Sequence, residues 1–231
     1  MTTLRAVCFD LDGTLIDSDE SIVASFFYAC DKLGIPRPDR KAIIGSIGYL
    51  LEDQIAQLTD YDPHKFATVY REYYGRVCCE LTQLMPGARE ILATLRAAGF
   101  LLGFATSKRR YYAEQILQRL GILDFFEARV GGEDVEKPKP DPEPLIKVAD
   151  ILGVSLNEML LVGDTRFDVL AARNAGMKCL CVTLGYEDRS VLDSLQPEGI
   201  FDSLEAVGAY IMARWGTARV KPSTCGDKAH A

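Results

Sequence analysis

Carboxylates, hydroxyls and lysines follow four short apolar stretches of the sequence. The four segments are, in order, Asp10-Leu11-Asp12-Gly13-Thr14, Thr106-Ser107-Lys108, Lys137-Pro138-Lys139-Pro140-Asp141-Pro142 and Gly163-Asp164-Thr165-Arg166-Phe167-Asp168. If they meet in space, four carboxylates share one site. Two unit charges ~4 Å apart repel by about 4 kcal/mol at an effective dielectric of ~20, so such a site needs a cation or must take up protons.

The chemistry of these side chains favours a hard metal ion. Asp10, Asp12, Asp164 and Asp168 offer oxygen ligands, and no His or Cys stands among them. Oxygen-only sites select an ion such as Mg²⁺, which keeps several waters and often takes a phosphate as a further ligand. The hydroxyl of Thr106 and a lysine ammonium suit the oxygens of that phosphate. We therefore expect a Mg²⁺ site that handles a phosphoryl group.

The elements that must position these residues alternate along the chain. Strands buried on both faces are predicted for residues 6–9, 100–105, 128–130, 159–162 and 178–183, because these runs are apolar without polar alternation. Stripes of helical period lie between several of them. Alternating strands and helices imply a parallel sheet, since parallel neighbours need a crossover connection. We predict an α/β fold with a doubly wound parallel sheet, in which ligands bind beyond the carboxyl ends of the strands.

Residues 17–82 interrupt this alternation with three or four segments of helical period. One helix is predicted from Asp19 to Leu33, stopped by Gly34, and another begins at Asp62-Pro63, where a capping residue precedes a proline at the first helical position. We predict an α/β core formed by residues 1–16 and 83–215 and an inserted helical cap at 17–82. Apolar periodicity is lost after Trp215, so a disordered tail is predicted for residues 216–231.

The ordered motifs resemble those of the haloacid dehalogenase-like hydrolase superfamily. The matching residues are Asp10-x-Asp12-Gly13-Thr14, Thr106, a lysine in a proline-rich loop, and Gly163-Asp164-x-x-x-Asp168. The helical insertion resembles the superfamily's C1 cap, and the resemblance covers about residues 5–215. It implies a Rossmann-like core and a phosphatase that works through an aspartyl-phosphate, with Asp10 as the nucleophile and Asp12 as the general acid and base.

The resemblance also implies the metal ligands. Asp10, the backbone carbonyl of Asp12 and Asp164 would hold Mg²⁺, and Asp168 would orient the ligands through water or a hydrogen bond. A purely structural role for Asp168, in the first turn of its helix, stays open as an alternative.

Phosphate ligands follow from the same resemblance. Thr106, backbone N–H groups near Ser107, and a lysine would bind the phosphoryl oxygens. Lys139 is predicted as that lysine and Lys137 is the second choice. Lys139 begins the family's Lys-Pro-x-Pro-x-x-apolar stretch, and it lies 25 residues before Asp164 (164 − 139 = 25), a spacing similar to that of relatives.

The sequence is interpreted as a Mg²⁺-dependent phosphomonoesterase for a small phosphorylated metabolite, with most resemblance to the phosphoglycolate phosphatase and pyrophosphatase group. A pyrophosphatase or a phosphosugar mutase of the same superfamily is the alternative. From another class, a receiver-like phospho-acceptor signalling domain also combines aspartates, Thr and Lys around Mg²⁺. Specificity is expected from the cap loop at residues 45–49 and from Lys41, Arg71 or Arg76, whereas Tyr70, Tyr73 and Tyr74 are interpreted as cap packing.

Composition excludes several other classes. Lys and Arg total 26 and Asp and Glu total 33, which gives a net charge of −7, and no basic run occurs. We therefore expect no nucleic-acid partner and no membrane partner. Lacking a secretory signal pattern and having seven cysteines without a CxxC motif, the sequence is predicted to be cytoplasmic with reduced, mostly buried thiols.

Overall fold

A parallel sheet of six strands forms the centre of the molecule in the computed structural model, which describes residues 3–216. The strand order is β5-β4-β1-β6-β7-β8. The strands are β1 (Ala6–Phe9), β4 (Leu101–Ala105), β5 (Ala128–Val130), β6 (Met159–Gly163), β7 (Lys178–Val182) and β8 (Gly199–Phe201). The chain crosses from β1 to its neighbours on both sides, so the predicted doubly wound α/β fold is confirmed.

Both faces of the sheet are buried, because successive side chains of each strand point to opposite sides. Val7 and Phe9 of β1 contribute to one hydrophobic cluster, and Ala6 and Cys8 to another. Helices α5 (Ala88–Ala97), α6 (Arg110–Arg119) and α10 (Leu204–Trp215) belong to the first cluster. Helices α7 (Glu143–Leu152), α8 (Arg166–Asn174) and α9 (Arg189–Leu195) belong to the second. This arrangement explains the uninterrupted apolar runs of the sequence.

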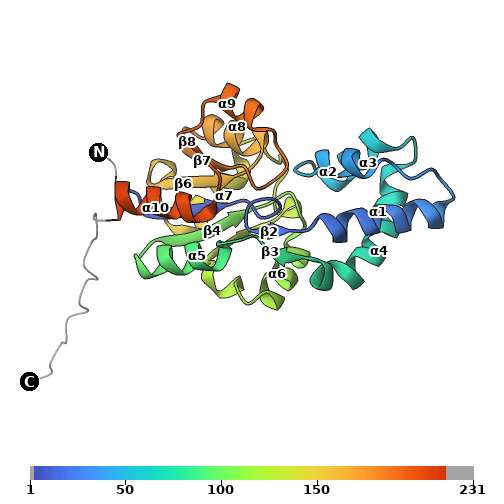
Figure 1. Cartoon of the computed structure of the whole chain (residues 1–231), viewed down its shortest axis with the longest axis horizontal. Helices are drawn as coiled ribbons and strands as arrows, with labels where there is room; N and C mark the ends of the chain where they lie inside the picture. Colours follow the sequence, from blue (N-terminus) through green and yellow to red (C-terminus); the bar gives the residue numbers. More distant parts are fainter. Residues whose placement is uncertain (1–2, 217–231) are drawn as a thin grey trace, which may run out of the picture.

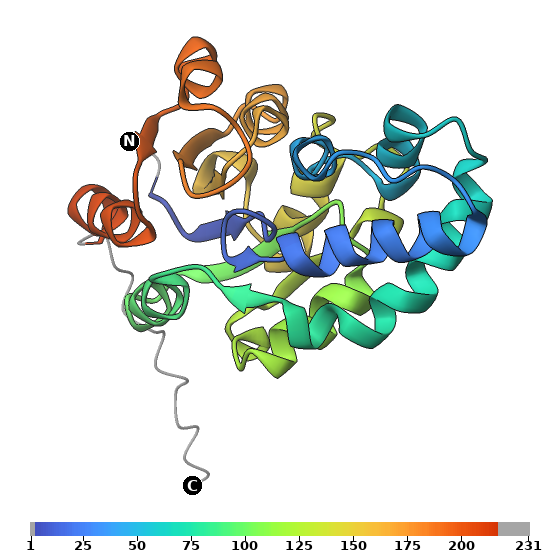
Figure 2. The same cartoon turned by 45° about the vertical axis from the view of Figure 1, so that its right-hand side comes forward.

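Helices α1 (Asp19–Leu33), α2 (Arg40–Gly45), α3 (Leu51–Leu58) and α4 (Pro63–Leu81) lie together on the right of Figure 1, beside the sheet and its helices. Figure 2 shows α1 running alongside α4. The chain enters and leaves this group through a small antiparallel pair, β2 (Ile16–Asp17) and β3 (Gln83–Leu84). The four helices therefore form an insertion between β1 and β4 whose two ends are adjacent.

Local signals in the sequence set the helix ends of this insertion. Asp62 accepts hydrogen bonds from the backbone N–H groups of His64 and Lys65, and Pro63 occupies the first turn of α4, as predicted. Gly34 ends α1 in a left-handed conformation, with φ of 68°. These two boundaries agree with the sequence patterns.

Other elements differ from the prediction. The strands predicted at 100–105, 159–162 and 178–183 are each displaced by one residue at one end. The strands β2, β3 and β8, the helices α9 and α10, and the short 3-10 turns η1 (Leu123–Phe125), η2 (Gly132–Asp134) and η3 (Leu156–Glu158) were not predicted. These strands have two or three residues each, too few for a periodic pattern, and pairing with neighbours decides them.

Most of the predicted tail, residues 217–231, lies outside the described residues. The six cysteines within the described chain are free thiols, and five of them are buried, in agreement with the predicted reduced state. Among the described helices, none combines the length and apolar character needed to cross a bilayer.

Candidate active site

The strand order brings three of the predicted segments together. Strands β4, β1 and β6 are neighbours in the sheet, and Thr106, Asp10 and Asp164 directly follow them. Because all three strands are parallel, their carboxyl ends meet at the same edge. Residues far apart in sequence thus form one site at this edge, as the sheet topology predicted.

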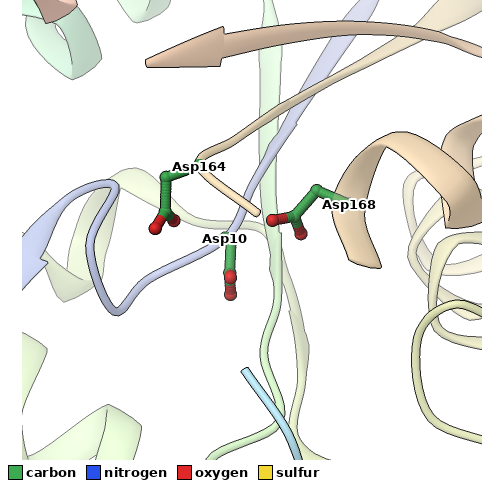
Figure 3. A group of neighbouring side chains, drawn as sticks. All are labelled: Asp10, Asp164 and Asp168. Carbon is green, nitrogen blue, oxygen red and sulfur yellow. The ribbon is translucent and has the colours of Figure 1, made fainter. Parts of the chain in front are cut away.

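Three buried carboxylates form the centre of the site. Asp10, Asp164 and Asp168 each offer an oxygen, and these oxygens lie within 4.8 Å of one another. Figure 3 shows that they come from the end of β1, the end of β6 and the start of α8. Asp10 is 5% exposed and the other two are fully buried. Such crowding of negative charge is costly unless a cation is present.

Burial and like charges act on the titration of this cluster. Burial raises the pKa of Asp10 to about 7, against the lowering effect of Lys139 and with a further rise from Asp168. Burial, followed by the charges of Asp168 and Asp10, raises the pKa of Asp164 well above its usual range. Burial alone would lower the pKa of Lys139, but the charges of Asp10 and Asp168 outweigh it and raise that pKa. One lysine does not neutralise three carboxylates.

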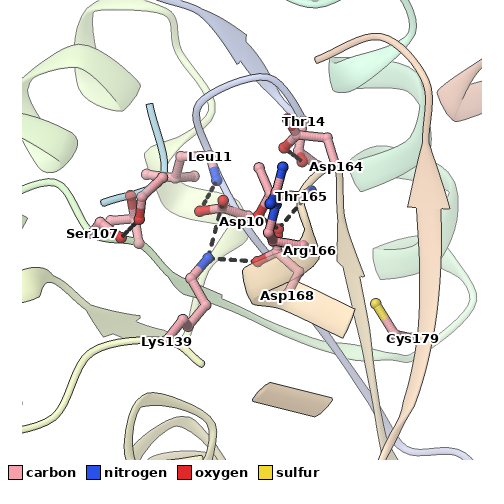
Figure 4. A network of polar contacts seen from close by, with 12 residues as sticks. Asp10, Leu11, Thr14, Ser107, Lys139, Asp164, Thr165, Arg166, Asp168 and Cys179 are labelled. Carbon is pink, nitrogen blue, oxygen red and sulfur yellow. Dashed lines mark hydrogen bonds and ion pairs between the residues drawn. The ribbon is translucent and has the colours of Figure 1, made fainter. Parts of the chain in front are cut away.

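Lys139 joins two of the carboxylates (Figure 4). Its Nζ lies 3.0 Å from Asp10 Oδ2 and donates a hydrogen bond of 2.6 Å to Asp168 Oδ1. The other oxygen of Asp168, Oδ2, accepts hydrogen bonds from the backbone N–H and the hydroxyl of Thr165, at 3.0 and 2.7 Å. Asp168 therefore caps helix α8 and holds Lys139 against Asp10 at the same time.

Asp164 is held by two donors from other segments. The Thr14 hydroxyl donates to Oδ1 at 2.7 Å, and the backbone N–H of Tyr186 donates to Oδ2 at 3.0 Å. Gly13 lies against this carboxylate with φ of +79°, and a Cβ atom there would collide with it. Only glycine meets both conditions without strain, which accounts for the Asp-Gly-Thr order of the motif.

Asp12 lies outside the three-carboxylate cluster. Its Oδ1 accepts a short hydrogen bond from the Ser18 hydroxyl and lies 3.1 Å from Nζ of Lys108. The Lys108 ammonium also donates a hydrogen bond of 2.6 Å to the hydroxyl of Tyr74 on α4. Asp12 is thus paired with Lys108, which also contacts the inserted helix α4.

Thr106 and Ser107 occupy the end of β4. Thr106 is 6% exposed, and its hydroxyl accepts a hydrogen bond from the backbone N–H of Lys108. The Ser107 hydroxyl donates to the carbonyl of Gly48, in the loop between α2 and α3, at 2.6 Å. The side chain of Ser107 therefore ties the core to the insertion, which leaves its backbone as the group available to an anion.

A cavity of about 220 Å³ lies between the strand ends and the inserted helices. We call its core side the floor, formed by Asp10, Asp12, Thr106, Ser107, Lys108, Arg109, Tyr112, Gly132 and Glu133. We call its other side the roof, formed by Ile22, Ile47, Gly48, Tyr49, Leu50, Leu51, Glu52, Gln54, Tyr70, Arg71 and Tyr74. The floor carries the reactive groups, and the roof is mainly apolar and aromatic.

Comparison with known proteins identifies the family. A sequence model described as haloacid dehalogenase-like hydrolase matches residues 7–182. The chain belongs to this family. It is 32% identical to a phosphoglycolate phosphatase of Salmonella typhi, over 88% of this chain and 90% of that protein, and 31% identical to the phosphoglycolate phosphatase of Escherichia coli K12, over 87% and 90%.

Solved structures of the family are also similar. A haloacid dehalogenase-like family hydrolase from Streptococcus pneumoniae superposes with a TM-score of 0.82 at 31% identity, covering 91% of this chain and all of that one. A predicted phosphoglycolate phosphatase from Haemophilus somnus gives 0.81 at 27% identity, covering 91% and 99%. The similarity spans the core and the insertion together.

The donor set of the cluster fits a hard divalent cation. Asp10 and Asp164 supply carboxylate oxygens in a buried setting, and their raised pKa values mark uncompensated negative charge that a cation relieves. Both oxygens of Asp168 are already engaged, by Lys139 and by Thr165. The Asp168 side chain therefore acts on the cluster through Lys139 as well as by proximity.

The structure separates the candidate cations. Lys139, the predicted phosphate-binding lysine, reaches Asp10, whereas Lys137, the second choice, is exposed. Lys41 and Arg76 are exposed and do not line the cavity, whereas Arg71 lines it and pairs with Glu52 at 2.6 Å.

The tyrosines of α4 also differ in whether they line the cavity. Tyr73 stacks on Tyr28, as expected for cap packing. Tyr70 and Tyr74 are packed in the hydrophobic cluster but line the cavity as well. Tyr70 and Tyr74 therefore combine the expected packing with a place in the cavity lining.

Sequence reasoning gave no role to three residues of the site, Thr14, Lys108 and Tyr186. Thr14 and Lys108 stand inside or beside the motifs, so their positions were a usable signal. Tyr186 follows β7 and contacts Asp164 through its backbone N–H. Any residue except proline could make this contact, so the sequence carries no signal for it.

Proposed function

We propose that this haloacid dehalogenase-like hydrolase is a Mg²⁺-dependent phosphatase that hydrolyses a small phosphate ester such as 2-phosphoglycolate. The observation that carries the proposal is the placement of Asp10. Its carboxylate lines a cavity of about 220 Å³, lies 3.0 Å from Lys139 and adjoins Asp164. Similarity to phosphoglycolate phosphatases over about nine tenths of their length supports the substrate class.

In the proposed reaction, Asp10 attacks phosphorus and the bond from phosphorus to the leaving oxygen breaks, which forms an aspartyl-phosphate. Asp12 donates a proton to the leaving alkoxide. Asp12 then accepts a proton from water as that water attacks phosphorus, and the bond to Asp10 breaks to release inorganic phosphate. Lys108 and Ser18 orient the Asp12 carboxylate during both steps.

Several groups bind the phosphoryl oxygens in this proposal. Thr106 supplies its hydroxyl, the loop at Ser107 supplies backbone N–H groups, and Lys139 supplies charge. Asp10, the Asp12 carbonyl and Asp164 would hold Mg²⁺, which offsets the negative charge of the phosphoryl group when bound. Asp168 is a positioning residue in this scheme, because its contacts run through Lys139 and Thr165.

The inserted helices act as a cap in this proposal, and we retain the division into a core of residues 1–16 and 83–215 and a cap of residues 17–82. The roof covers the reacting groups with apolar side chains, which limits access of bulk water. Two contacts hold the roof loop, residues 46–50 between α2 and α3, on the core. They are the Ser107–Gly48 hydrogen bond and the edge-on contact of Tyr49 with Phe167, at 4.6 Å between ring centres.

The test is a panel of phosphate esters and inorganic pyrophosphate, assayed with Mg²⁺ or EDTA for the wild type and Asp10→Asn. We expect hydrolysis by the wild type with Mg²⁺ alone, and a loss on the order of 10⁴-fold or more in Asp10→Asn. Equal rates for the two proteins would remove Asp10 as the nucleophile.

The same panel separates the alternatives. Preference for pyrophosphate would indicate a pyrophosphatase, and dependence on a sugar bisphosphate would indicate a phosphosugar mutase. A receiver-like domain would not release product continuously from p-nitrophenyl phosphate, and membership in a hydrolase family already favours turnover.

A further inference from the structure

Two lysines whose side chains are largely covered serve different sides of the site. Lys139 is 3% exposed in its side chain, contacts Asp10 and Asp168, and does not line the cavity. Lys108 is 8% exposed, contacts Asp12 and Tyr74, and lines the cavity. The first ammonium therefore faces the nucleophile, and the second faces the space in which the rest of a substrate must lie.

The position of Asp12 fixes which part of a substrate meets Lys108. In the proposed reaction Asp12 protonates the leaving oxygen, so that oxygen and the carbon attached to it lie beside Asp12. Lys108 Nζ is 3.1 Å from Asp12 Oδ1. A group one or two bonds beyond the leaving oxygen therefore lies within reach of this ammonium.

The ammonium has capacity for a further partner. A lysine has three donors, and the partners of Lys108 among the described residues are the Tyr74 hydroxyl at 2.6 Å and Asp12. The Tyr74 ring also lies below the ammonium, with its centre 4.9 Å from Nζ. Tyr74 thus fixes the direction of the Lys108 side chain from the roof while one donor is left for a ligand.

The remaining cavity lining argues for Lys108 over the other cations. Ile22, Ile47 and Tyr70 give the roof an apolar character, and a carboxylate in apolar surroundings needs a cation. Arg71 is already paired with Glu52 at 2.6 Å, and Arg109 is exposed.

We propose that Lys108, oriented by Tyr74, is a specificity-determining residue that binds a carboxylate carried on the leaving group of a short phosphate ester. The inference rests on the proposed function and extends it from the phosphoryl group to the leaving group. Lys139 acts on every ester, whereas Lys108 selects among them. The cavity volume of about 220 Å³ limits the leaving group to a few carbons.

The test compares 2-phosphoglycolate with 2-hydroxyethyl phosphate, which has the same carbon chain without the carboxylate. We expect Lys108→Met to lower kcat/KM for 2-phosphoglycolate by roughly 10- to 100-fold, mainly through KM, as for loss of a charged hydrogen bond. The loss on 2-hydroxyethyl phosphate should be smaller by roughly 10-fold or more, because that ester shares any effect of Lys108 on Asp12 and has no carboxylate to lose. Lys108→Arg should restore part of the preference, and Tyr74→Phe should weaken it less than Lys108→Met does.

The matched control is Lys65→Met, since Lys65 lies on α4 with a side chain 74% exposed and outside the cavity. It should leave both esters unaffected, and thermal unfolding checks that each variant is folded. Equal losses on the two esters in Lys108→Met would show that Lys108 acts on Asp12 and would overturn the inference, as would no loss on either ester. A wild type that prefers 2-hydroxyethyl phosphate overturns the inference alone, whereas one that hydrolyses neither ester overturns the proposed function with it.

Discussion

The floor and the roof of the cavity differ in how their polar groups are held. In the carboxylate cluster, which contributes Asp10 to the floor, the side chains of Asp10, Asp164 and Asp168 are fixed by donors from separate segments, and each has at least one partner within 3.0 Å. At the roof, the side chains are mainly apolar or aromatic, and the ion pair of Arg71 with Glu52 lies at its partly exposed rim. The crowded carboxylates need donors in fixed positions, whereas the roof contributes mainly an apolar and aromatic surface.

This difference separates two kinds of substitution. A change at the carboxylate cluster or its supports should affect every ester, because the phosphoryl group is common to all of them. A change at the roof or at Lys108 should alter the choice of ester, because these groups face the leaving group. Four experiments break or sharpen this distinction.

Among these four experiments, the largest effect is expected at Asp164. Asp164→Asn removes a charged oxygen from the cluster. Loss of an outer partner of a metal ligand costs roughly 10–100-fold, so we expect loss of a ligand itself to lower activity by about 100-fold or more. Mg²⁺ at 100 times its dissociation constant should stabilise the wild type by about 2.7 kcal/mol. Thermal unfolding with and without Mg²⁺ should show this gain in the wild type and little of it in the variant. Equal gains would exclude Asp164 as a ligand.

Gly13→Ala should have the next largest effect. The residue has φ of +79°, and an added Cβ would displace the Asp164 carboxylate. We expect a loss of stability of roughly 1–3 kcal/mol from backbone strain and loss of activity on all esters. Gly34→Ala is the matched control, because Gly34 has φ of +68° with nothing within 4 Å of its Cβ position. That control should be destabilised and remain active; inactivation of both would assign the effect to strain alone.

A pH dependence follows from Asp10. Burial raises its pKa to about 7 from an ordinary value of 3.8. Between these values the folded chain keeps a proton that the unfolded chain has released, so stability falls as pH rises, by about 1.4 kcal/mol per pH unit for this one group. In EDTA, urea unfolding of the wild type and Asp10→Asn from pH 4.5 to 6.5 should show the variant gaining relative stability with pH. Parallel profiles would contradict the buried charge.

The smallest effect is expected where the floor meets the roof. Ser107→Ala removes the hydrogen bond to the Gly48 carbonyl and should cost about 0.5–1.5 kcal/mol of stability. Because the proposed phosphate contact uses the backbone, kcat should change little, while KM rises through a less firmly held roof loop. Steady-state kinetics and urea unfolding measure the two changes. A large fall in kcat with unchanged KM would assign the hydroxyl itself to the reaction.

The core was predictable because chemistry and topology reinforce each other there. Buried strands leave uninterrupted apolar runs, and Asp10, Thr106 and Asp164 each stand directly after one. Lys139 was distinguished from Lys137 by the Lys-Pro-x-Pro-x-x-apolar pattern and by its spacing from Asp164, and the structure brings Lys139 to Asp10. Parallel strands then make convergence at one edge a consequence of the fold.

The roof was predictable only in outline. Helical period and caps located α1 and α4, yet the cavity lining depends on how the helices pack, and neither Tyr74 nor Lys108 carries a sequence signal for their contact. Lys41 and Arg76 were chosen by charge and position, and packing left both outside the cavity. Short elements such as β8 depend on tertiary pairing, which local pattern does not contain.

Ile16 pairs with Leu84 and Asp17 with Gln83, so the residues at which the chain enters and leaves the inserted helices are neighbours. Joining Asp17 to Gln83 through a two-residue turn would convert this junction into a β-hairpin and leave the threading of the large sheet unchanged. Material between the two points can therefore be lengthened, shortened or replaced without rerouting a strand. A lineage can therefore keep the strand-end residues that react with the phosphoryl group while the inserted helices, which contact the leaving group, are exchanged.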